Sequence, residues 1–272
     1  MGVVNATPDS FYAASRHQAL GEARDIALRM VEAGAVIIDL GGESTRPGSL
    51  FVDEEAEFER VIPLVRAIRA ESDVAISVDT RKAAVWRRAL DSGADILNDI
   101  SALRHEPECG ALAARAGATV VLMHMQGEPK TMQEAPIYVD CLAEVVAFLG
   151  QALRRALEAG IPSDRIVLDP GIGFGKRLDD NLALIAGLGA LTALGQPVLV
   201  GLSRKSFVGG LTGRPAEGRL AGTLGATGAA WQAGARLFRV HDVEETRDFL
   251  TVVSAVASAA ATAAAARSGR RG

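Results

Sequence analysis

Three side chains that make directional hydrogen bonds each follow a short apolar segment of the sequence: Asp79, Asn98 and Asp169. A carboxylate accepts hydrogen bonds from amino and ring N–H groups, whereas an amide both donates and accepts. If the fold brings the three together, they can bind the edge of a flat heterocycle that carries an amino group, a ring N–H and a carbonyl. Taken singly, an Asp or Asn after a strand is more often an N-cap or turn residue, so this interpretation depends on their convergence.

Positive charge gathers in the last part of the chain, where Lys205, Arg239 and His241 follow two further apolar segments. Two fixed cations and a histidine suit a diphosphate better than a single carboxylate. The residues alone therefore suggest a heterocycle-binding floor beside an anion-binding wall.

Eight short apolar runs carry these polar residues, and longer amphipathic stretches separate the runs. Short apolar runs between helices are typical of strands buried on both faces of a parallel sheet. Glycine recurs before the runs, where a helix ends, because it adopts left-handed backbone without strain. The predicted strands are Gly2–Val4, Val36–Leu40, Val74–Val78, Asp95–Leu97, Thr119–Met123, Ile166–Leu168, Val198–Leu202 and Leu237–Val240. The predicted helices are Leu20–Ala33, Glu54–Ala70, Lys82–Ser92, Pro107–Ala116, Val139–Ala159, Leu178–Leu194, Gly222–Ala233 and Val243–Ala265.

Eight β/α units in a chain of 272 residues predict a single (β/α)8 TIM barrel of the α/β class, with its active site at the C-terminal strand ends. The alternative is an open doubly wound sheet, but Asn5-Ala6-Thr7-Pro8-Asp9 stands where that fold usually carries G-x-G-x-x-G. We expect the barrel to occupy residues 1–256, and the Ala/Arg-rich segment 257–272 to be a helix end or disordered. Every predicted strand ends in polar groups, which a barrel brings to one mouth: Asn5, Asp39, Asp79, Asn98-Asp99, His124, Asp169, Ser203-Arg204-Lys205 and Arg239-Val240-His241.

The composition narrows the class of function. The chain is 49% hydrophobic and 23% charged, which is ordinary for a globular protein with a large core. Its net charge of −4 argues against a nucleic-acid partner, which would need a basic stripe. Cys109 and Cys141 have no CxxC or Cys/His spacing, so we expect neither a disulfide framework nor a zinc site, and free thiols fit a reducing cytoplasm. We expect no secretory signal and no membrane span, since the Ala-rich segment 254–266 is too short and too weakly apolar for a bilayer.

Three glycine-containing segments follow predicted strands. Residues 41–48, GGESTRPG, are either a Ser/Thr cap before the next helix or a mobile active-site loop from which Arg46 reaches an anion. Residues 169–176, DPGIGFGK, have the wrong glycine spacing for a dinucleotide loop and predict a tight turn that lets the backbone approach a ligand. Residues 201–206, GLSRKS, end like a Walker motif but lack its upstream glycine, so that interpretation is rejected.

Together these segments resemble the dihydropteroate synthase family, and the resemblance runs from Gly2 to about Leu250. Each matching motif is weak alone, but eight in order at predicted strand ends are highly specific. They are MGVVNATPDSF at 1–11, GGESTRPG at 41–48, SVDT at 77–80, LNDIS at 97–101, VLMHM at 121–125, DPG at 169–171, SRKS at 203–206 and RVHD at 239–242. The resemblance implies a transferase that joins a pterin diphosphate to p-aminobenzoate in folate biosynthesis.

The resemblance also implies a role for each matching position. The pterin ring would be held by Asp79, Asn98, Met123, Asp169 and Lys205. The diphosphate would be held by Asn5, Thr45, Arg46, Arg239 and His241. The p-aminobenzoate pocket, which is also where sulfonamides bind, would be lined by Phe11, Thr45, Pro47, Phe174 and Ser206. Lys205, Arg239 and His241 would be catalytic, and Asn5 would touch Mg²⁺, which needs few protein ligands because it keeps waters and takes phosphate oxygens.

The implied partners are the two small-molecule substrates and a second copy of the chain, because the family is typically homodimeric. Two alternatives stay open: a pterin-dependent methyltransferase, and a catalytically silent pterin-binding paralogue. A methyltransferase would have no use for the cations on the last two strands. The silent paralogue is kept open by the first loop, where the family usually has Ser-Asp-Gly-Gly after Ser10-Phe11 and this chain has Tyr12-Ala13-Ala14-Ser15.

Overall fold

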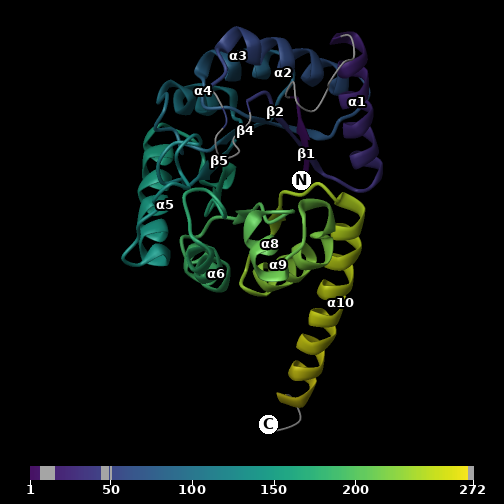
Figure 1. Ribbon diagram of the computed structural model, residues 1–272, viewed down its shortest axis with the longest axis vertical. Coiled ribbons are helices and arrows are strands. Elements are labelled where there is room, and N and C mark those ends of the chain that lie inside the picture. The colour runs from purple at the N-terminus through teal and green to yellow at the C-terminus, as the bar shows by residue number, and fades with distance from the viewer. Residues whose placement is uncertain (7–15, 44–48, 50, 269–272) are drawn as a thin grey trace.

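The structure is a computed structural model that describes residues 1–6, 16–43, 49 and 51–268 (Figure 1). Strands alternate with helices, as the sequence predicts, with two helices instead of one between β6 and β7 and between β7 and β8. Among the residues described, no helix has both the length and the apolar character that crossing a bilayer requires.

The strands run parallel to their neighbours and follow one another in sequence order. One sheet contains β1 (Gly2–Asn5), β2 (Ile37–Gly41), β3 (Ala75–Asp79), β4 (Ile96–Asp99), β5 (Thr119–Met123) and β6 (Ile166–Asp169). A second contains β7 (Leu199–Val200) and β8 (Leu237–Phe238), both shorter than predicted. Single parallel bridges, Leu168 with Val198 and Gly2 with Val240, link the two sheets on either side. The ladder is therefore interrupted at these two junctions.

Helices lie around the outside of the strands (Figure 1). They are α1 (Arg16–Glu32), α2 (Glu54–Arg69), α3 (Ala83–Asp91), α4 (Glu108–Ala116), α5 (Cys141–Glu158), α6 (Leu178–Ala186), α7 (Leu188–Thr192), α8 (Ser206–Thr212), α9 (Leu220–Gln232) and α10 (Val243–Ser268). Two short 3-10 turns, η2 (Ser163–Arg165) and η3 (Ala216–Gly218), complete the set for the described residues.

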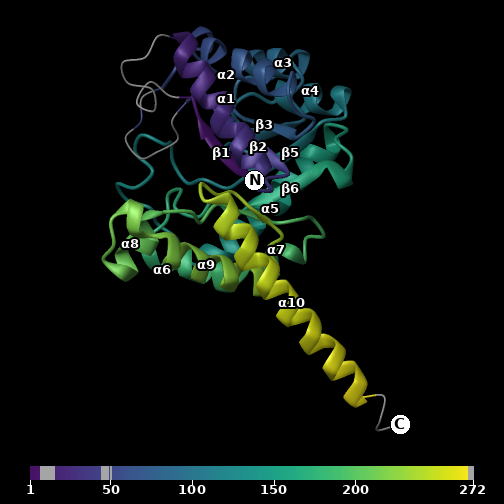
Figure 2. The same cartoon turned by 90° about the vertical axis from the view of Figure 1, so that its right-hand side faces the viewer.

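Several helix ends differ from the prediction by one to four residues, as at the start of α1, and three further departures concern the course of the chain. The single helix expected over 178–194 is divided at Gly187, where an added Cβ would overlap the side chain of Leu142. The short helix α8 stands where the sequence predicted only a loop. The last helix continues to Ser268, so residues 257–268 are helical, and its end projects from the body of the molecule (Figure 2).

The N-cap residue of α2 tests one of the two interpretations of residues 41–48. Asp53 Oδ1 accepts a hydrogen bond of 2.8 Å from the backbone N–H of Ala56, so Asp53 is the N-cap residue. The capping role considered for the Ser or Thr of residues 41–48 is therefore wrong.

Candidate active site

The predicted site residues that stand on strands lie on the inner face, because side chains two apart along a strand point the same way. Near the N-terminal strand ends this face is apolar, with a buried cluster of Ile96, Val121, Val167 and Leu199 and partly buried Ile37, Ala75 and Leu237 packed against it. Two residues further along, the same strands carry Asp39, Ser77, Asn98, Met123, Asp169, Gly201 and Arg239. The polar layer therefore lies at the C-terminal strand ends. The apolar side chains beneath it form a plug that fills the N-terminal part of the inner face.

Asp39 is the hub of this polar layer. It is fully buried, and its Oδ1 accepts a hydrogen bond of 2.5 Å from the Ser77 hydroxyl. The amide nitrogen of Asn98 lies 3.3 Å from both carboxylate oxygens, and Nε of Arg239 donates to Oδ2 at 2.6 Å. Three strands, β2, β3 and β4, and the segment after β8 are thus linked at one carboxylate.

Sequence reasoning placed Asp39 among the strand-end residues but gave it no role. The signal was present, because a carboxylate between Ile38 and Leu40 in a buried strand must have a partner.

Arg239 bridges two carboxylates. Besides its bond to Asp39, its Nη2 lies 3.3 Å from Oδ2 of Asp79, which is the neighbour of Asn98 in the register of β3 and β4. Burial raises the pKa of Asp79 to about 8, although the Arg239 guanidinium acts in the opposite direction. Burial alone would lower the pKa of Arg239, but the carboxylates of Asp39 and Asp79 raise it above its usual value. The predicted floor and wall therefore meet at Asp79 and Arg239.

Asp169 and Lys205 stand on the other side of this layer. Asp169 Oδ1 accepts a hydrogen bond of 2.7 Å from the Gly171 N–H, and burial raises the pKa of Asp169. The Lys205 ammonium donates to the Ile172 carbonyl and lies 4.7 Å from the centroid of the Phe174 ring. Burial lowers the pKa of Lys205 to about 8, with the charge of Asp169 acting in the opposite direction. A buried carboxylate and the ammonium of a half-buried lysine thus face the same region.

An apolar wall completes the inner face. Met123 is 3% exposed and packs with Ile100, Met125 and Met132, against which Phe174 is partly buried. Met123 is also the register neighbour of Asp169 in β5 and β6. Thioether and aromatic groups at this place offer a flat ligand an apolar surface beside the acid.

The glycines after β6 form the predicted tight turn. Gly171, Gly173 and Gly175 all have positive φ, at 65°, 82° and 59°. An added Cβ at Gly171 would overlap the carbonyl oxygen of His124, and one at Gly175 would overlap that of Gln126. The close approach that requires glycine is therefore made, at these two positions, to the segment after β5, and the approach to a ligand stays a prediction.

Lys176 anchors this turn, and sequence reasoning missed it. Its ammonium is buried, donates to the Phe174 carbonyl at 3.0 Å and lies 3.0 Å from Nδ1 of His124. Burial lowers the pKa of Lys176 to about 7 and that of His124 to about 3. A neutral His124 ring can accept from Lys176, so the pair holds the turn to the end of β5.

The remaining described site residues line the rim. His241 Nδ1 lies 3.0 Å from the Ser203 hydroxyl, which joins the segments after β7 and β8. Ser206 is exposed at the first residue of α8. Asn5 is half-buried at the end of β1, where Gly41 is its register neighbour in β2. Phe11, Thr45, Arg46 and Pro47 lie outside the described residues.

Comparison with known proteins identifies the family. The family described as "Pterin binding enzyme" matches residues 1–241. The dihydropteroate synthase of Escherichia coli strain K12 is 48% identical over 255 residues, which cover 94% of this chain and 90% of that protein. The chain belongs to the dihydropteroate synthase family.

Solved structures of that family agree in fold. The dihydropteroate synthase of Yersinia pestis, in a sulfonamide drug complex, superposes with a TM-score of 0.89 at 45% identity, covering 95% of this chain and 94% of that one. The enzyme of Xanthomonas albilineans with 4-aminobenzoic acid gives a TM-score of 0.88 at 47% identity, covering 94% and 92%. The predicted family, transferase class and TIM-barrel fold are therefore confirmed.

The described residues fit a Mg²⁺ ion only if it takes few ligands from the protein. Among the described residues, no three His, Cys, Asp or Glu side chains group as a protein-made metal site would need. The side chain of Asn5 offers one neutral oxygen at the mouth of the barrel, where Gly41 is its register neighbour in β2. Mg²⁺ commonly takes one or two protein oxygens and completes its shell with phosphate oxygens and waters, so Asn5 together with a diphosphate fits the ion.

Proposed function

We propose that this site condenses a pterin diphosphate with p-aminobenzoate, giving 7,8-dihydropteroate and diphosphate. The observation that carries the proposal is the pair of buried carboxyls, Asp79 and Asp169, facing one inner layer with a cation beside each of them. The 4-aminobenzoic acid in the related enzyme of Xanthomonas albilineans supports the choice of the second substrate.

The pterin ring lies on the floor made by Asp79, Asn98 and Asp169. Its amino and ring N–H groups donate to the two carboxylates, while Asn98 both donates and accepts. Met123 packs against the ring, and Lys205 hydrogen bonds to it from the Asp169 side. Each buried donor that finds its acceptor contributes about 0.5–1.5 kcal/mol, and more where the acceptor is charged.

The diphosphate lies against Arg239 and His241, with Asn5, Thr45 and Arg46 as its further contacts. Pterin donors that satisfy Asp79 release the N–H of Nη2 that Arg239 directs at Asp79, while Nε and Nη2 both stay in contact with Asp39. Mg²⁺ bound at Asn5 would supply positive charge to the diphosphate oxygens. We assign the catalytic role to Lys205, Arg239 and His241.

The reaction breaks the bond between the pterin methylene carbon and the diphosphate oxygen, and the bonding electrons leave with the diphosphate. Arg239 and His241 stabilise the charge that develops on this leaving group. The methylene carbon becomes cationic, stabilised by the ring and by the nearby carboxylates. The arylamine nitrogen then attacks this carbon and loses a proton. Because an aniline nitrogen is unprotonated at neutral pH, no strong base is needed.

The p-aminobenzoate pocket adjoins the turn after β6. Phe174 and Ser206 form its described part, and Phe11, Thr45 and Pro47 are proposed to complete it. Sulfonamides would bind in the same pocket, as the sulfonamide complex of the Yersinia pestis relative supports. We also propose that the enzyme is a homodimer of the cytoplasm, where its two buried free cysteines would stay reduced.

A turnover assay with the pterin diphosphate, p-aminobenzoate and Mg²⁺ tests the proposal. Release of diphosphate that depends on p-aminobenzoate is expected. Pterin binding without turnover would instead support the silent paralogue, for which the altered loop residues Tyr12-Ala13-Ala14-Ser15 are the one specific observation. Methyl transfer from a methylated pterin would support the methyltransferase.

A further inference from the structure

Four consecutive backbone carbonyls in the turn after β6 each accept a hydrogen bond from a different side chain. The carbonyls are those of Ile172, Gly173, Phe174 and Gly175, and their donors are Lys205, Gln133, Lys176 and Tyr138 in that order. The bonds from Gln133, Lys176 and Tyr138 are 2.5, 3.0 and 2.7 Å long. Side chains therefore fix the course of the backbone on both sides of Phe174.

The turn needs this support because it is made largely of glycine. Gly171, Gly173 and Gly175 all have positive φ, and glycine loses more backbone freedom on folding than any other residue. The N–H of Gly173 is held as well, since it donates at 2.6 Å to Oδ1 of Asn181, a buried residue of α6. The conformation of the turn is therefore supplied largely by the side chains around it.

The donors come from several elements. Gln133 and Tyr138 belong to the segment between β5 and α5, whereas Lys205 directly precedes α8. Lys176 ends the turn and also contacts His124 after β5, with 3.0 Å to its Nδ1 and 3.3 Å to its carbonyl oxygen. The segment after β5 is therefore bonded to the turn at three separate points.

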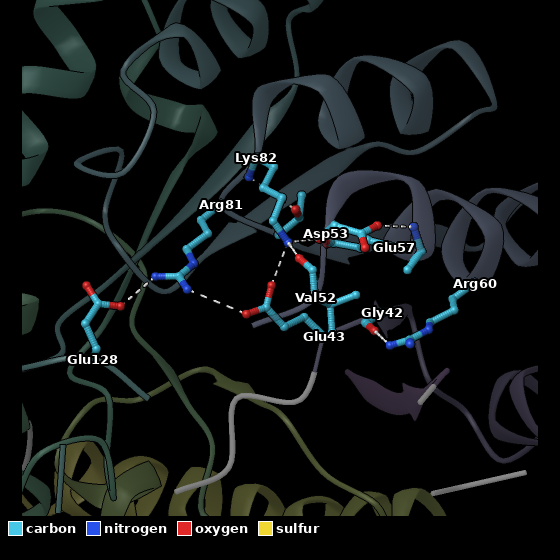
Figure 3. A network of polar contacts seen from close by, with 11 residues as sticks. Gly42, Glu43, Val52, Asp53, Glu57, Arg60, Arg81, Lys82 and Glu128 are labelled. Atoms are coloured by element: carbon cyan, nitrogen blue, oxygen red, sulfur yellow. Dashed lines mark hydrogen bonds and ion pairs between the residues drawn. The ribbon is translucent and has the colours of Figure 1, made fainter. Parts of the chain in front are cut away.

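Lys176 and Lys82 are both buried but have different partners. Lys82 donates to the carboxylates of Glu43 and Glu57 and to the Val52 carbonyl, so two negative charges lie beside its ammonium (Figure 3). Among the described residues, the hydrogen-bond partners of Lys176 are two carbonyl oxygens and an imidazole nitrogen. A buried ammonium without a carboxylate partner costs stability, so the stability of the fold does not account for Lys176.

Phe174 lies at the centre of this network. Its ring packs against the cluster that contains Met123 and Met132, and the Lys205 ammonium lies 4.7 Å from the ring centroid. Because the carbonyls before, at and after Phe174 are all held, the direction of its Cα–Cβ bond is fixed, and the position of the ring follows from it. The network therefore determines where an aromatic wall stands beside the pterin floor.

We propose that the three side chains that hold the carbonyls of residues 173–175 are positioning residues for the condensation: they fix the ring of Phe174 at the place where it contacts p-aminobenzoate. These side chains are Gln133, Tyr138 and Lys176. A fixed aromatic wall orients the flat arylamine, and the orientation of a nucleophile relative to the carbon it attacks contributes to the rate. This inference rests on the proposed function, in which Phe174 lines the p-aminobenzoate pocket. None of the three side chains touches substrate in this proposal.

Tyr138→Phe is the main test, because it removes one hydroxyl and keeps the buried ring. We expect KM for p-aminobenzoate to rise by about fivefold, the scale of one lost hydrogen bond. Lys176→Met removes the donor to the Phe174 carbonyl itself and should raise this KM by about tenfold or more, with a lower melting temperature. Binding of a pterin without diphosphate, measured by calorimetry, should stay within about threefold of wild type in both variants, because the removed groups bond to none of the residues proposed to hold the pterin ring.

A double-mutant cycle shows whether the effect passes through the aromatic ring. Phe174→Leu removes the ring and should itself raise KM for p-aminobenzoate. Adding Tyr138→Phe to Phe174→Leu should then change KM by less than about twofold, because the ring that the hydroxyl positions is already gone. The same rise in both backgrounds would overturn the positioning role.

Arg69→Met is the matched control for Lys176→Met. Arg69 also donates to several backbone carbonyls, those of Ser72, Val74 and Gly93, but these lie just before β3 and β4, at the opposite end of the strands. Its loss should lower the melting temperature and leave KM for p-aminobenzoate unchanged. A rise in KM equal to that in Lys176→Met would overturn the positioning role, because the effect would then be one of general stability.

The remaining outcomes separate this inference from the proposed function. A wild-type protein without turnover would overturn the proposed function, and this inference with it. Normal wild-type turnover together with an unchanged KM for p-aminobenzoate in both Tyr138→Phe and Lys176→Met would overturn the positioning role alone. A loss of pterin affinity as large as the rise in KM would also overturn it, because the turn would then support the whole site.

Discussion

Asp79 joins the two halves of the site, because its carboxyl belongs to the pterin floor and contacts the arginine of the anion wall at 3.3 Å. Its pKa, raised by burial to about 8, means that the free protein carries it mainly protonated at neutral pH. The ionised form is the one that accepts hydrogen bonds from pterin donors. Pterin binding should therefore release a proton below that pH. We expect affinity for a pterin without diphosphate to rise by up to about tenfold per pH unit toward pH 8, then level off.

The measurement is calorimetry across this pH range in wild type and in Asp79→Asn. The variant should bind the pterin more weakly and lack the part of the affinity rise with pH that comes from Asp79. The contributions from titration of the pterin and of Asp169 should remain in both proteins. Equal slopes in the two proteins would show that Asp79 does not titrate on binding.

Lys205 and Arg239 should fail in different ways. Lys205→Met removes a hydrogen bond to the pterin, so we expect weaker binding of a pterin without diphosphate, by about tenfold. Arg239→Lys keeps a cation beside Asp39 and Asp79 but loses the fork that suits a diphosphate. It should raise KM for the pterin diphosphate and lower kcat, with little change in binding of the shorter pterin. The placement of Lys205 is wrong if both variants bind that pterin as wild type does.

At the residue level, the sequence predicted which side chains reach the mouth, because alternation along a strand determines which face each one occupies. It could not predict how they pair. Arg239 and Asp39 are 200 residues apart, and no local pattern states that they meet. Lys82 was read only as the start of a helix, since its three acceptors lie 25 to 39 residues upstream.

Among the elements, the turn after β6 gives a sharp prediction, because one of its glycines can be compared with a glycine of nearly the same φ elsewhere in the chain. Gly171 and Gly117 have φ of 65° and 64°, but an added Cβ meets the His124 carbonyl at Gly171 and nothing within 4 Å at Gly117. Gly117→Ala should cost about 1–2 kcal/mol of stability through backbone strain alone, with activity unchanged. Gly171→Ala should cost clearly more and lower kcat/KM, because Gly171 donates to Asp169.

Urea unfolding and steady-state kinetics check this pair. Equal losses of stability in the two variants would mean that the approach to His124 relaxes without cost. The prediction for Asp169 fails separately if Gly171→Ala is less stable but fully active.

Element prediction succeeded where periodicity is strong and weakened where tertiary contacts decide. Strand β5 and the start of α2 were predicted to the residue. The requirement for glycine at position 187 depends on the side chain of Leu142 from another helix, and the formation of α8 depends on packing of Phe207 and Val208 into the core. Neither cause can be read from the local sequence.

At the scale of the whole molecule, the inner face of the barrel has two parts: an apolar part that stabilises the fold and a polar part that carries the site. The apolar cluster of Ile96, Val121, Val167 and Leu199 fills the N-terminal half of that face, and the polar layer lies two residues further along. A change in the polar layer therefore leaves the apolar plug beneath it in place. Buried polar side chains such as Asp39 therefore bind to one another, and the apolar side chains below them support the site.

The end of α10 offers the test at this scale, because it projects from the body in Figure 2. The helix packs through Val243 and Thr246, both buried, and through Leu250, whereas Val252 and Val256 are 63% and 66% exposed. Deleting residues 257–272 removes the projecting end of α10 and the residues after it, so the free energy of unfolding should change by less than about 0.5 kcal/mol and kcat/KM should not change. Light scattering should give the truncated variant the same number of chains per particle as the full-length protein. A deletion that leaves the kinetics intact but yields monomers would place the proposed dimer interface on this projecting helix.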